Sequence, residues 1–293
     1  MVLVAAAVLQ DAVAPSAVSV AVTVTRDDVP VAGLTAADFR VFEDGREQAL
    51  TSVTSGSLPL SLAIVIDTSD STAGLRQQLA QEFVKNLIAG LGPEDEVAIV
   101  SYDGTINLPV RWTTPKELPV LDWARWKTMP SNEVLQGVYQ AFGLMNDAKN
   151  QRLTIVAISD AQQIASKHRL ADFVKSRRES ETAIYGVRTA DLLSGTAAID
   201  GPRPTGSGTM QWESRGALVS LDDLVRDSGG VVLPARTTTE AAAAADRVLK
   251  DLRSQYLLTF TSSKAADKKY RRIKVELRNR SDKLRFRQGY FAG

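Results

Sequence analysis

The sequence predicts an α/β protein in which a doubly wound, mostly parallel sheet is inserted in a small β-sandwich formed by both termini. Between about residues 58 and 252, apolar strand patterns alternate with helical patterns, which is typical of a sheet covered by helices on both faces. Residues 17–56 before it and 254–291 after it have β patterns instead. Because both flanks are rich in strands, the economical arrangement has the two termini build one sandwich around the inserted domain.

The composition is that of an ordinary globular protein. The chain has 293 residues, of which 44% are hydrophobic and 24% charged, and its net charge of +1 gives no overall field that favours nucleic acid or an anionic membrane. The absence of cysteine excludes disulfides, thiolate metal sites and cysteine nucleophiles. No apolar run reaches the roughly 18 residues that a membrane-spanning helix needs, so we expect no membrane span.

The first 16 residues contain an apolar run long enough for the core of a signal peptide, but they lack its basic leader. We expect either a trimmed or atypical export signal or a disordered start. After it we expect the N-terminal part of the sandwich at 17–56, the α/β domain at 57–252 and the C-terminal part of the sandwich at 253–293.

The first elements follow from periodicity and turn residues. The stretch "AVSVAVTVTRD" alternates with period two, and "FRVFEDGREQALTSV" predicts a strand, an "EDG" turn and a second strand. The run "LAIVIDTS" is nearly all apolar, as in a strand buried on both faces of a parallel sheet. A helix is predicted in "LRQQLAQEFVKNLIAGLG", with Gly92 and Pro93 after its end and apolar residues at helical spacing: Leu75, Leu79, Phe83, Leu87 and Ile88.

The later elements continue the alternation. The strands "EVAIVSYDG" and "INLPVRW" form an expected hairpin around Asp103 and Gly104. Further helices are predicted in "NEVLQGVYQAFGLM", "QIASKHRLADFVKSRR", "LDDLVRDSGG" and "TTEAAAAADRVLKDLRSQ", the last capped by a threonine. Further strands are predicted in "RLTIVAISD", "AIYGVRT", "VVLP", "YLLTFTSS", "RRIKVELRN" and "LRFRQGYF". The unpatterned segment 190–217 follows a parallel strand, so we expect a functional or disordered loop at the ligand-binding edge of the sheet.

Two predicted strands end in carboxylates. The stretch "DTSDS" at 67–71 lets one carboxylate and two hydroxyls converge above the first buried strand, and Asp160 ends another apolar strand. Two parallel strands that end at the same edge place both carboxylates on one rim. Oxygen ligands of this kind suit a hard cation such as Mg²⁺. The alternative is that Asp67, Ser69 and Ser71 cap a helix, a common position for these residue types.

These motifs resemble a known family. "AIVIDTSDS", with "AISDA" downstream, resembles the metal-ion-dependent adhesion site of von Willebrand factor A domains. The flanking "VAGLTAADFRVFEDGREQ", "LRSQYLLTF" and "KLRFRQGYF" resemble the VWFA-related domain proteins abundant in acidobacteria, so that the resemblance covers about residues 17–292. It implies a Rossmann-like domain in a secreted, periplasmic or cell-surface protein. Such a protein engages a partner through a divalent cation, Mg²⁺ or else Mn²⁺ or Ca²⁺, with no catalytic step.

The resemblance also implies the ligands. Asp67, Ser69, Ser71 and Asp160 match family positions at which serines bind the metal directly and aspartates bind it largely through water. The fifth position is a threonine that opens a helix, and Asn132 in "PSNEVLQGV" aligns with it here. An asparagine carbonyl can bind Mg²⁺, and it can equally cap the helix.

Two departures from the family pattern bear on this site. Asp70 stands between the serines where glycine is common, and Ala161 follows the second aspartate where glycine is usual. The charge of Asp70 can strengthen cation binding or repel an acidic partner. A carboxylate from a protein partner would complete the metal shell, and a polysaccharide is the alternative class of partner.

Aromatic and basic residues extend the list of candidate contacts. Trp123, Trp126 and Trp212 lie in or beside segments expected around the rim, where aromatic residues serve as binding hot spots, with core packing as the alternative. For Trp112 we expect core packing. The basic C-terminal strands alternate charge with apolar residues, which indicates a solvated strand face, and nucleic acid is not an expected partner.

Enzymatic alternatives lack their required residues. A phosphotransferase of the haloacid dehalogenase type needs a carboxylate two residues after its nucleophile, where this chain has Ser69. A hydrolase triad needs a base, and the one histidine, His168, lies in a predicted helix as a solvated side chain. We therefore expect no enzyme. The competing hypothesis is a metal-independent structural or assembly subunit with a vestigial metal site.

Overall fold

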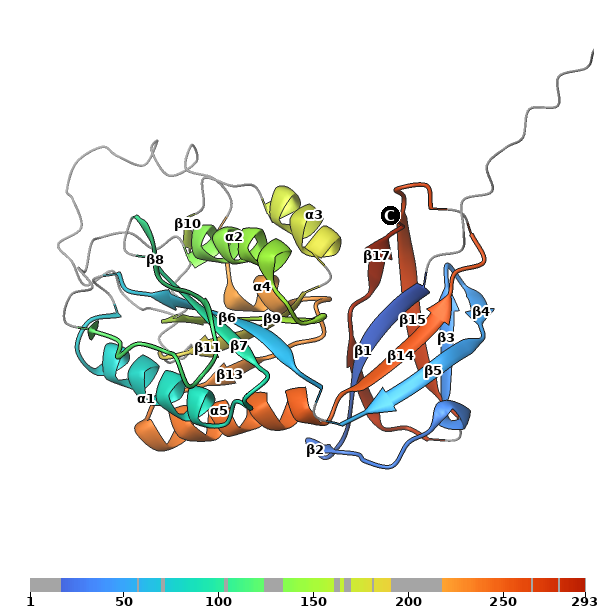
Figure 1. Cartoon of the computed structure of the whole chain (residues 1–293), viewed down its shortest axis with the longest axis horizontal. Helices are drawn as coiled ribbons and strands as arrows, with labels where there is room; N and C mark the ends of the chain where they lie inside the picture. The colour runs from blue at the N-terminus through green and yellow to red at the C-terminus, as the bar shows by residue number, and fades with distance from the viewer. Residues whose placement is uncertain are drawn as a thin grey trace, which may run out of the picture.

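The computed structural model describes residues 17–56, 58–69, 72–102, 105–123, 134–160, 164–165, 170–180, 182–190, 218–264, 266–278 and 280–292. Their strands form one six-stranded sheet, two antiparallel sheets of five and four strands, and one two-stranded pair. Figure 1 shows helices on both faces of the six-stranded sheet, with the two antiparallel sheets packed together beside it.

The six-stranded sheet has the order β13-β11-β9-β6-β7-β8. Its neighbours are parallel except for β7 and β8, which form the expected antiparallel pair. The strands are β6 (Leu60–Asp67), β7 (Glu96–Tyr102), β8 (Ile106–Thr113), β9 (Arg152–Ser159), β11 (Ala183–Arg188) and β13 (Val232–Pro234). The two-stranded pair is β10 (Ile164–Ala165) with β12 (Leu218–Val219).

The helices cover the sheet in two layers. The successive side chains of the central strand β6 point to opposite faces of the sheet, and the strand is buried along its whole length because both faces are covered. Leu62 and Ile64 pack into one apolar cluster with Phe83 of α1, and Ala63 and Val65 belong to the opposite cluster. The helices are α1 (Leu75–Ala89), α2 (Val134–Leu144), α3 (Leu170–Ser180), α4 (Leu221–Val225) and α5 (Thr238–Arg253), with 3₁₀ turns η1 (Ala36–Asp38) and η4 (Met145–Asp147).

Strands from both ends of the chain build the sandwich. One sheet has the order β16-β1-β14-β5 with β2 beside β1, and the other has the order β17-β15-β3-β4. A single apolar cluster joins them, with Val20 and Phe260 from the first sheet and Val41 and Val275 from the second. The strands are β1 (Ala17–Arg26), β2 (Val29–Pro30), β3 (Phe39–Glu43), β4 (Arg46–Gln48), β5 (Leu50–Ser55), β14 (Tyr256–Thr261), β15 (Tyr270–Leu277), β16 (Lys283–Phe286) and β17 (Gly289–Phe291). The fold class predicted from the sequence is confirmed.

Three predicted elements were wrong in detail. The predicted helix "QIASKHRLADFVKSRR" begins only at Leu170, because Ile164 and Ala165 pair with β12 as the strand β10. The predicted strands "REQALTSV" and "LRFRQGYF" are each divided, and their halves belong to different sheets of the sandwich. Thr237 caps α5 as expected, its hydroxyl accepting from the Glu240 amide at 3.1 Å. Residues 1–16, His168 and 191–217 lie outside the described residues.

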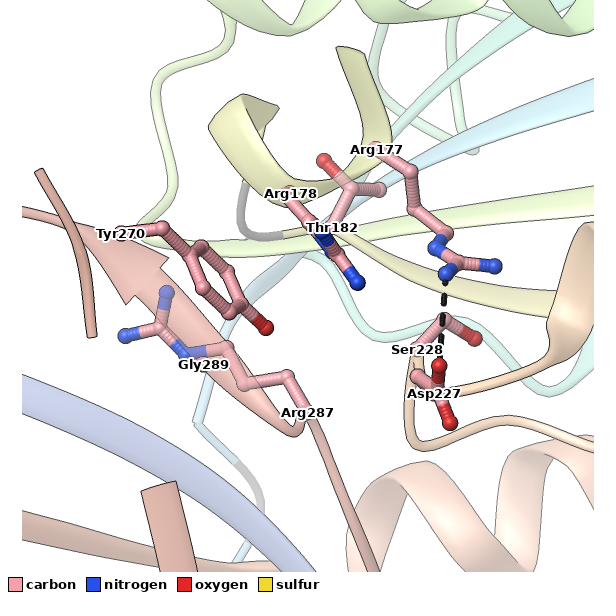
Figure 2. A pocket seen from close by; sticks show the side chains of 8 residues that line it. All are labelled: Arg177, Arg178, Thr182, Asp227, Ser228, Tyr270, Arg287 and Gly289. Carbon is pink, nitrogen blue, oxygen red and sulfur yellow. Dashed lines mark ion pairs between the residues drawn. The ribbon is translucent and has the colours of Figure 1, made fainter. Parts of the chain in front are cut away.

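A polar junction connects the two parts of the molecule. The guanidinium of Arg178, on α3, lies 4.6 Å from the ring centroid of Tyr270, on β15 of the sandwich. Beside this contact Arg177 Nη2 lies 3.6 Å from Asp227 Oδ2, and Figure 2 shows both arginines around a shared cavity. The cavity measures about 10 Å³, which is room for about one water. It is a packing feature of the junction and too small for a ligand.

No helix within the described ranges is long and apolar enough to cross a membrane.

Two glycines offer a matched test of the packing. A Cβ at Gly230 would lie 1.8 Å from the carbonyl oxygen of Ile184, whereas a Cβ at Gly143 would have no neighbour within 4 Å. We expect Gly230→Ala to lower the free energy of unfolding by about 3 kcal/mol, since the clash is with backbone. Gly143→Ala, on the exposed face of α2, should raise it by about 0.5–1 kcal/mol. Urea unfolding of both variants measures the difference, and equal stabilities would contradict the packing described.

Candidate metal site at the sheet edge

The loop after β6 is held in place by its own polar groups. The Ser69 amide donates to Asp67 Oδ1 at 3.0 Å, and the Thr72 hydroxyl donates to the carbonyls of Asp67 and Ser69 at 3.0 and 2.7 Å. The helix α1 begins only at Leu75, after the N-cap Gly74, whose φ is 69° and which makes no side-chain cap bond. Asp67 and Ser69 therefore do not cap α1. They lie at the carboxyl end of β6 instead.

Asp67 is a buried carboxylate whose hydrogen-bond donors among the described residues are neutral. Its side chain accepts from the Ser69 amide and, at 2.8 Å, from the Ser159 hydroxyl, and within the described part of the chain it forms no ion pair. Burial raises the pKa of Asp67 to about 6, the negative charge of Asp160 adds to this rise, and the hydrogen bonds oppose it. An anion in this position would gain from a nearby cation.

Asp160 lies on the same edge and does have a cationic partner. It follows the last residue of β9, the neighbour of β6, and its side chain is 1% exposed. Arg76, from the first turn of α1, places Nη1 2.8 Å from Asp160 Oδ2. One guanidinium thus faces a rim that carries two buried carboxylates.

The structure brings together three of the residues predicted to bind metal: Asp67, Ser69 and Asp160, all buried at the carboxyl edge of the sheet. Five other residues predicted for the site or its partner surface lie outside the described residues: Asp70, Ser71, Trp126, Asn132 and Trp212. One predicted residue of the partner surface is described.

This residue is Trp123, which is half-buried. It packs against the apolar cluster beneath α1, and its carbonyl accepts from Gln77 Nε2 at 3.2 Å. Trp112 packs against the opposite cluster and donates its indole N–H to the Leu144 carbonyl at 2.9 Å, in keeping with the core position expected for it.

Three residues of the site were missed in the sequence. Arg76 reaches Asp160 from a helix whose rotation the sequence does not fix, and Ser159 binds Asp67 because β9 pairs with β6 in one register. Thr189 follows β11, its amide donates to the Ser159 carbonyl at 3.0 Å, and its buried hydroxyl has no hydrogen-bond partner among the described residues. A hydroxyl after a parallel strand is a signal that could have identified Thr189.

The donor set has the chemistry of a site for a hard cation. The described groups are carboxylate and hydroxyl oxygens, the ligands that Mg²⁺, Mn²⁺ and Ca²⁺ prefer. The described residues contain no cluster of three or more His, Asp or Glu side chains that could hold a metal. A cation here would therefore depend on hydroxyls and water as well as on Asp67 and Asp160, with Arg76 already bound to one oxygen.

The mostly parallel sheet between two helical layers is that of a Rossmann-like domain, and the oxygen donors on its carboxyl edge form a candidate binding site. Residues 62–163 match the family described as the von Willebrand factor type A domain. Over this span, which is about a third of its length, the chain is similar to von Willebrand factor A domains. No curated protein matches the chain.

Solved structures resemble the chain at low identity. A von Willebrand factor type A protein from Catenulispora acidiphila is 10% identical, with 97% of this chain and 74% of that chain covered and a TM-score of 0.46. BatB from Bacteroides thetaiotaomicron is 13% identical, with coverage of 67% and 100% and a TM-score of 0.41. The PilB minor pilin from Streptococcus sanguinis is 9% identical, with coverage of 68% and 62% and a TM-score of 0.48. Because these scores lie below 0.5, the assignment depends on the family match and the strand order.

Proposed function

We propose that this chain is a binding protein that engages a protein partner through a divalent cation held at the rim by Asp67, Ser69 and Asp160. The proposed set also includes Ser71 and Asn132, and Mg²⁺ is the proposed cation, with Mn²⁺ and Ca²⁺ as substitutes. We propose no catalytic step. The secreted, periplasmic or cell-surface location stays a prediction from the resemblance.

The buried carboxylate of Asp67 carries this proposal. A buried anion is costly unless a cation or strong hydrogen bonds compensate it, and the described donors to Asp67 are neutral. Asp160 adds a second negative charge, while Arg76 supplies one positive charge to the rim. A divalent cation would more than offset this excess of one negative charge, and a partner carboxylate could then complete its shell.

Titration of Mg²⁺ and of Mn²⁺ into the protein, followed by calorimetry, tests the proposal. We expect the unmodified protein to give binding heat and Asp67→Ala to give none. Asp246→Ala is the matched control, because Asp246 is an exposed carboxylate on α5. Circular dichroism shows whether each variant is folded. Absence of heat with either ion in the unmodified protein would sink the metal-dependent function.

The second candidate function is a metal-independent structural or assembly subunit with a vestigial site. The Arg76–Asp160 ion pair favours it, because a guanidinium already neutralises one of the two carboxylates. Such a subunit would bind its partner equally well in the presence of a chelator. Such a subunit would also need no bound cation, so the calorimetric titration of Mg²⁺ and Mn²⁺ decides between the two functions.

A further inference from the structure

We propose that Arg76 is a built-in competitor of the divalent cation: it occupies Asp160 when the cation is absent and must release that carboxylate before the rim can bind metal. This inference rests on the proposed function and adds a means of regulating the same site. It assigns to Arg76 the role of setting the cation concentration at which the rim becomes able to bind a partner.

The first observation is the asymmetry of the ion pair. Asp160 is fixed, with a side chain that is 1% exposed, whereas the side chain of Arg76 is 32% exposed. A partly exposed arginine can exchange its partner for water at a modest cost, while a buried carboxylate cannot. The pair therefore opens by movement of Arg76, and Asp160 stays on the rim to receive another cation.

The second observation is the position of Arg76 in its helix. It is the second residue of α1, whose first turn contains no acidic residue and whose N-cap Gly74 makes no side-chain cap bond. The positive end of the helix dipole lies here, so that a cationic side chain is unfavourable in the first turn. The contact with Asp160 compensates for this placement, which gives the arginine a specific reason to lie at the rim.

The third step is electrostatic. A divalent cation near Asp67 and Asp160 would repel a guanidinium held 2.8 Å from Asp160 Oδ2. The two cations cannot share that oxygen without cost, so binding of one weakens binding of the other by the same factor. Removal of the guanidinium should therefore strengthen metal binding, and metal binding should displace the guanidinium.

Calorimetric titration of Mg²⁺ into three variants of the 293-residue chain tests the inference. Arg76→Gln removes the competing charge and should lower the Kd for Mg²⁺ by on the order of tenfold. Arg76→Lys keeps a positive charge and should bind more weakly than Arg76→Gln. Lys85→Gln is the matched control, since it removes an exposed positive charge from the same helix, where Lys85 faces Glu82, and it should leave the Kd unchanged.

The outcomes separate the two proposals. Tighter binding in Arg76→Gln than in the unmodified protein, with unchanged binding in Lys85→Gln, supports the competition. Binding in Arg76→Gln with none in the unmodified protein overturns the proposed function and the regulatory role, because Arg76 would then block the rim permanently. Equal or weaker binding in Arg76→Gln, with binding in the unmodified protein, overturns the role of Arg76 and leaves the proposed function intact. Absence of binding in every variant overturns both proposals.

A direct readout comes from the guanidinium itself. The Nε–H resonance of Arg76, assigned by its loss in Arg76→Gln, should shift as Mg²⁺ is added to the unmodified protein. A resonance that stays unchanged while calorimetry shows binding would overturn the competition.

Discussion

Replacement of Asp67 by asparagine is expected to raise the free energy of unfolding of the metal-free protein at pH 7 by on the order of 3 kcal/mol. The reason is that the pKa of the buried Asp67 carboxyl rises from 3.8 to about 6 on folding, so that its ionisation opposes the folded state. Asparagine has nearly the same shape and can keep the contacts with Ser69 and Ser159. The same change removes a carboxylate from the proposed metal site.

The pH dependence has a definite sign. Because the pKa of Asp67 is higher in the folded state, its contribution to stability is fully present below about pH 3.8 and is lost as the pH rises through about 6. Urea unfolding in a chelator at several pH values from 4 to 7 should show this loss in the unmodified protein and its absence in Asp67→Asn.

Saturating Mg²⁺ should reverse the order of stability at neutral pH, because a bound cation stabilises only the protein that binds it. If Asp67→Asn proves less stable than the unmodified protein without metal, the prediction is wrong and the folded protein stabilises the ionised form of Asp67.

Replacement of Arg271 by methionine is expected to lower the free energy of unfolding by about 3–5 kcal/mol. Arg271 and Glu43 form a buried ion pair inside the sandwich at 3.2 Å, with side chains 3% and 0% exposed. The Ser262 and Tyr290 hydroxyls also donate to Glu43, at 2.9 and 2.5 Å, so the network joins strands from both ends of the chain. Without Arg271, the Glu43 carboxylate would remain buried without a cation beside it.

Arg272→Met is the control for this substitution, because Arg272 lies next to Arg271 on β15 but is exposed. Its effect should lie within about 0.5 kcal/mol. Adding Glu43→Gln to Arg271→Met should recover part of the loss, since the buried charge is then removed. Thermal and urea unfolding of the unmodified protein, Arg271→Met, Glu43→Gln and the double variant give the coupling energy, and a loss below about 1 kcal/mol in Arg271→Met would contradict the buried network.

The sequence was sufficient for most of the fold because its patterns are local. The run that ends in Asp67 is apolar throughout, as a strand covered on both faces requires, and β6 is buried along its whole length. The division of "REQALTSV" could not be predicted, because Ala49 alone separates β4 from β5 and neither glycine nor proline marks the change of sheet. The strand β10 is two residues long and is held by a distant partner, so no local period reveals it.

The candidate site was predictable only in part, because some of its contacts depend on segments that are distant in the sequence. The carboxyl ends of parallel strands share one edge of a sheet, and this general rule is enough to place Asp67 and Asp160 together from the sequence alone. The contact of Arg76 with Asp160 depends on how α1 is rotated over the sheet, which packing of the whole domain determines. The domain boundaries expected from the sequence stay predictions.

The way in which β5 and β14 pair has a consequence for synthesis of the chain. Ser55 lies opposite Tyr256, and β1 pairs with β14 from Ala17 to Val22, so the first strands to be made wait for partners from the far end. With about 200 residues between β5 and β14, ribosomes working at about 5–20 residues per second leave these strands unpaired for about 10–40 seconds. Folding of the inserted domain brings Ser55 and Tyr256 together and shortens the loop that must close. We therefore expect the sandwich to assemble last, and its N-terminal strands to be the segment that most needs a chaperone during translation.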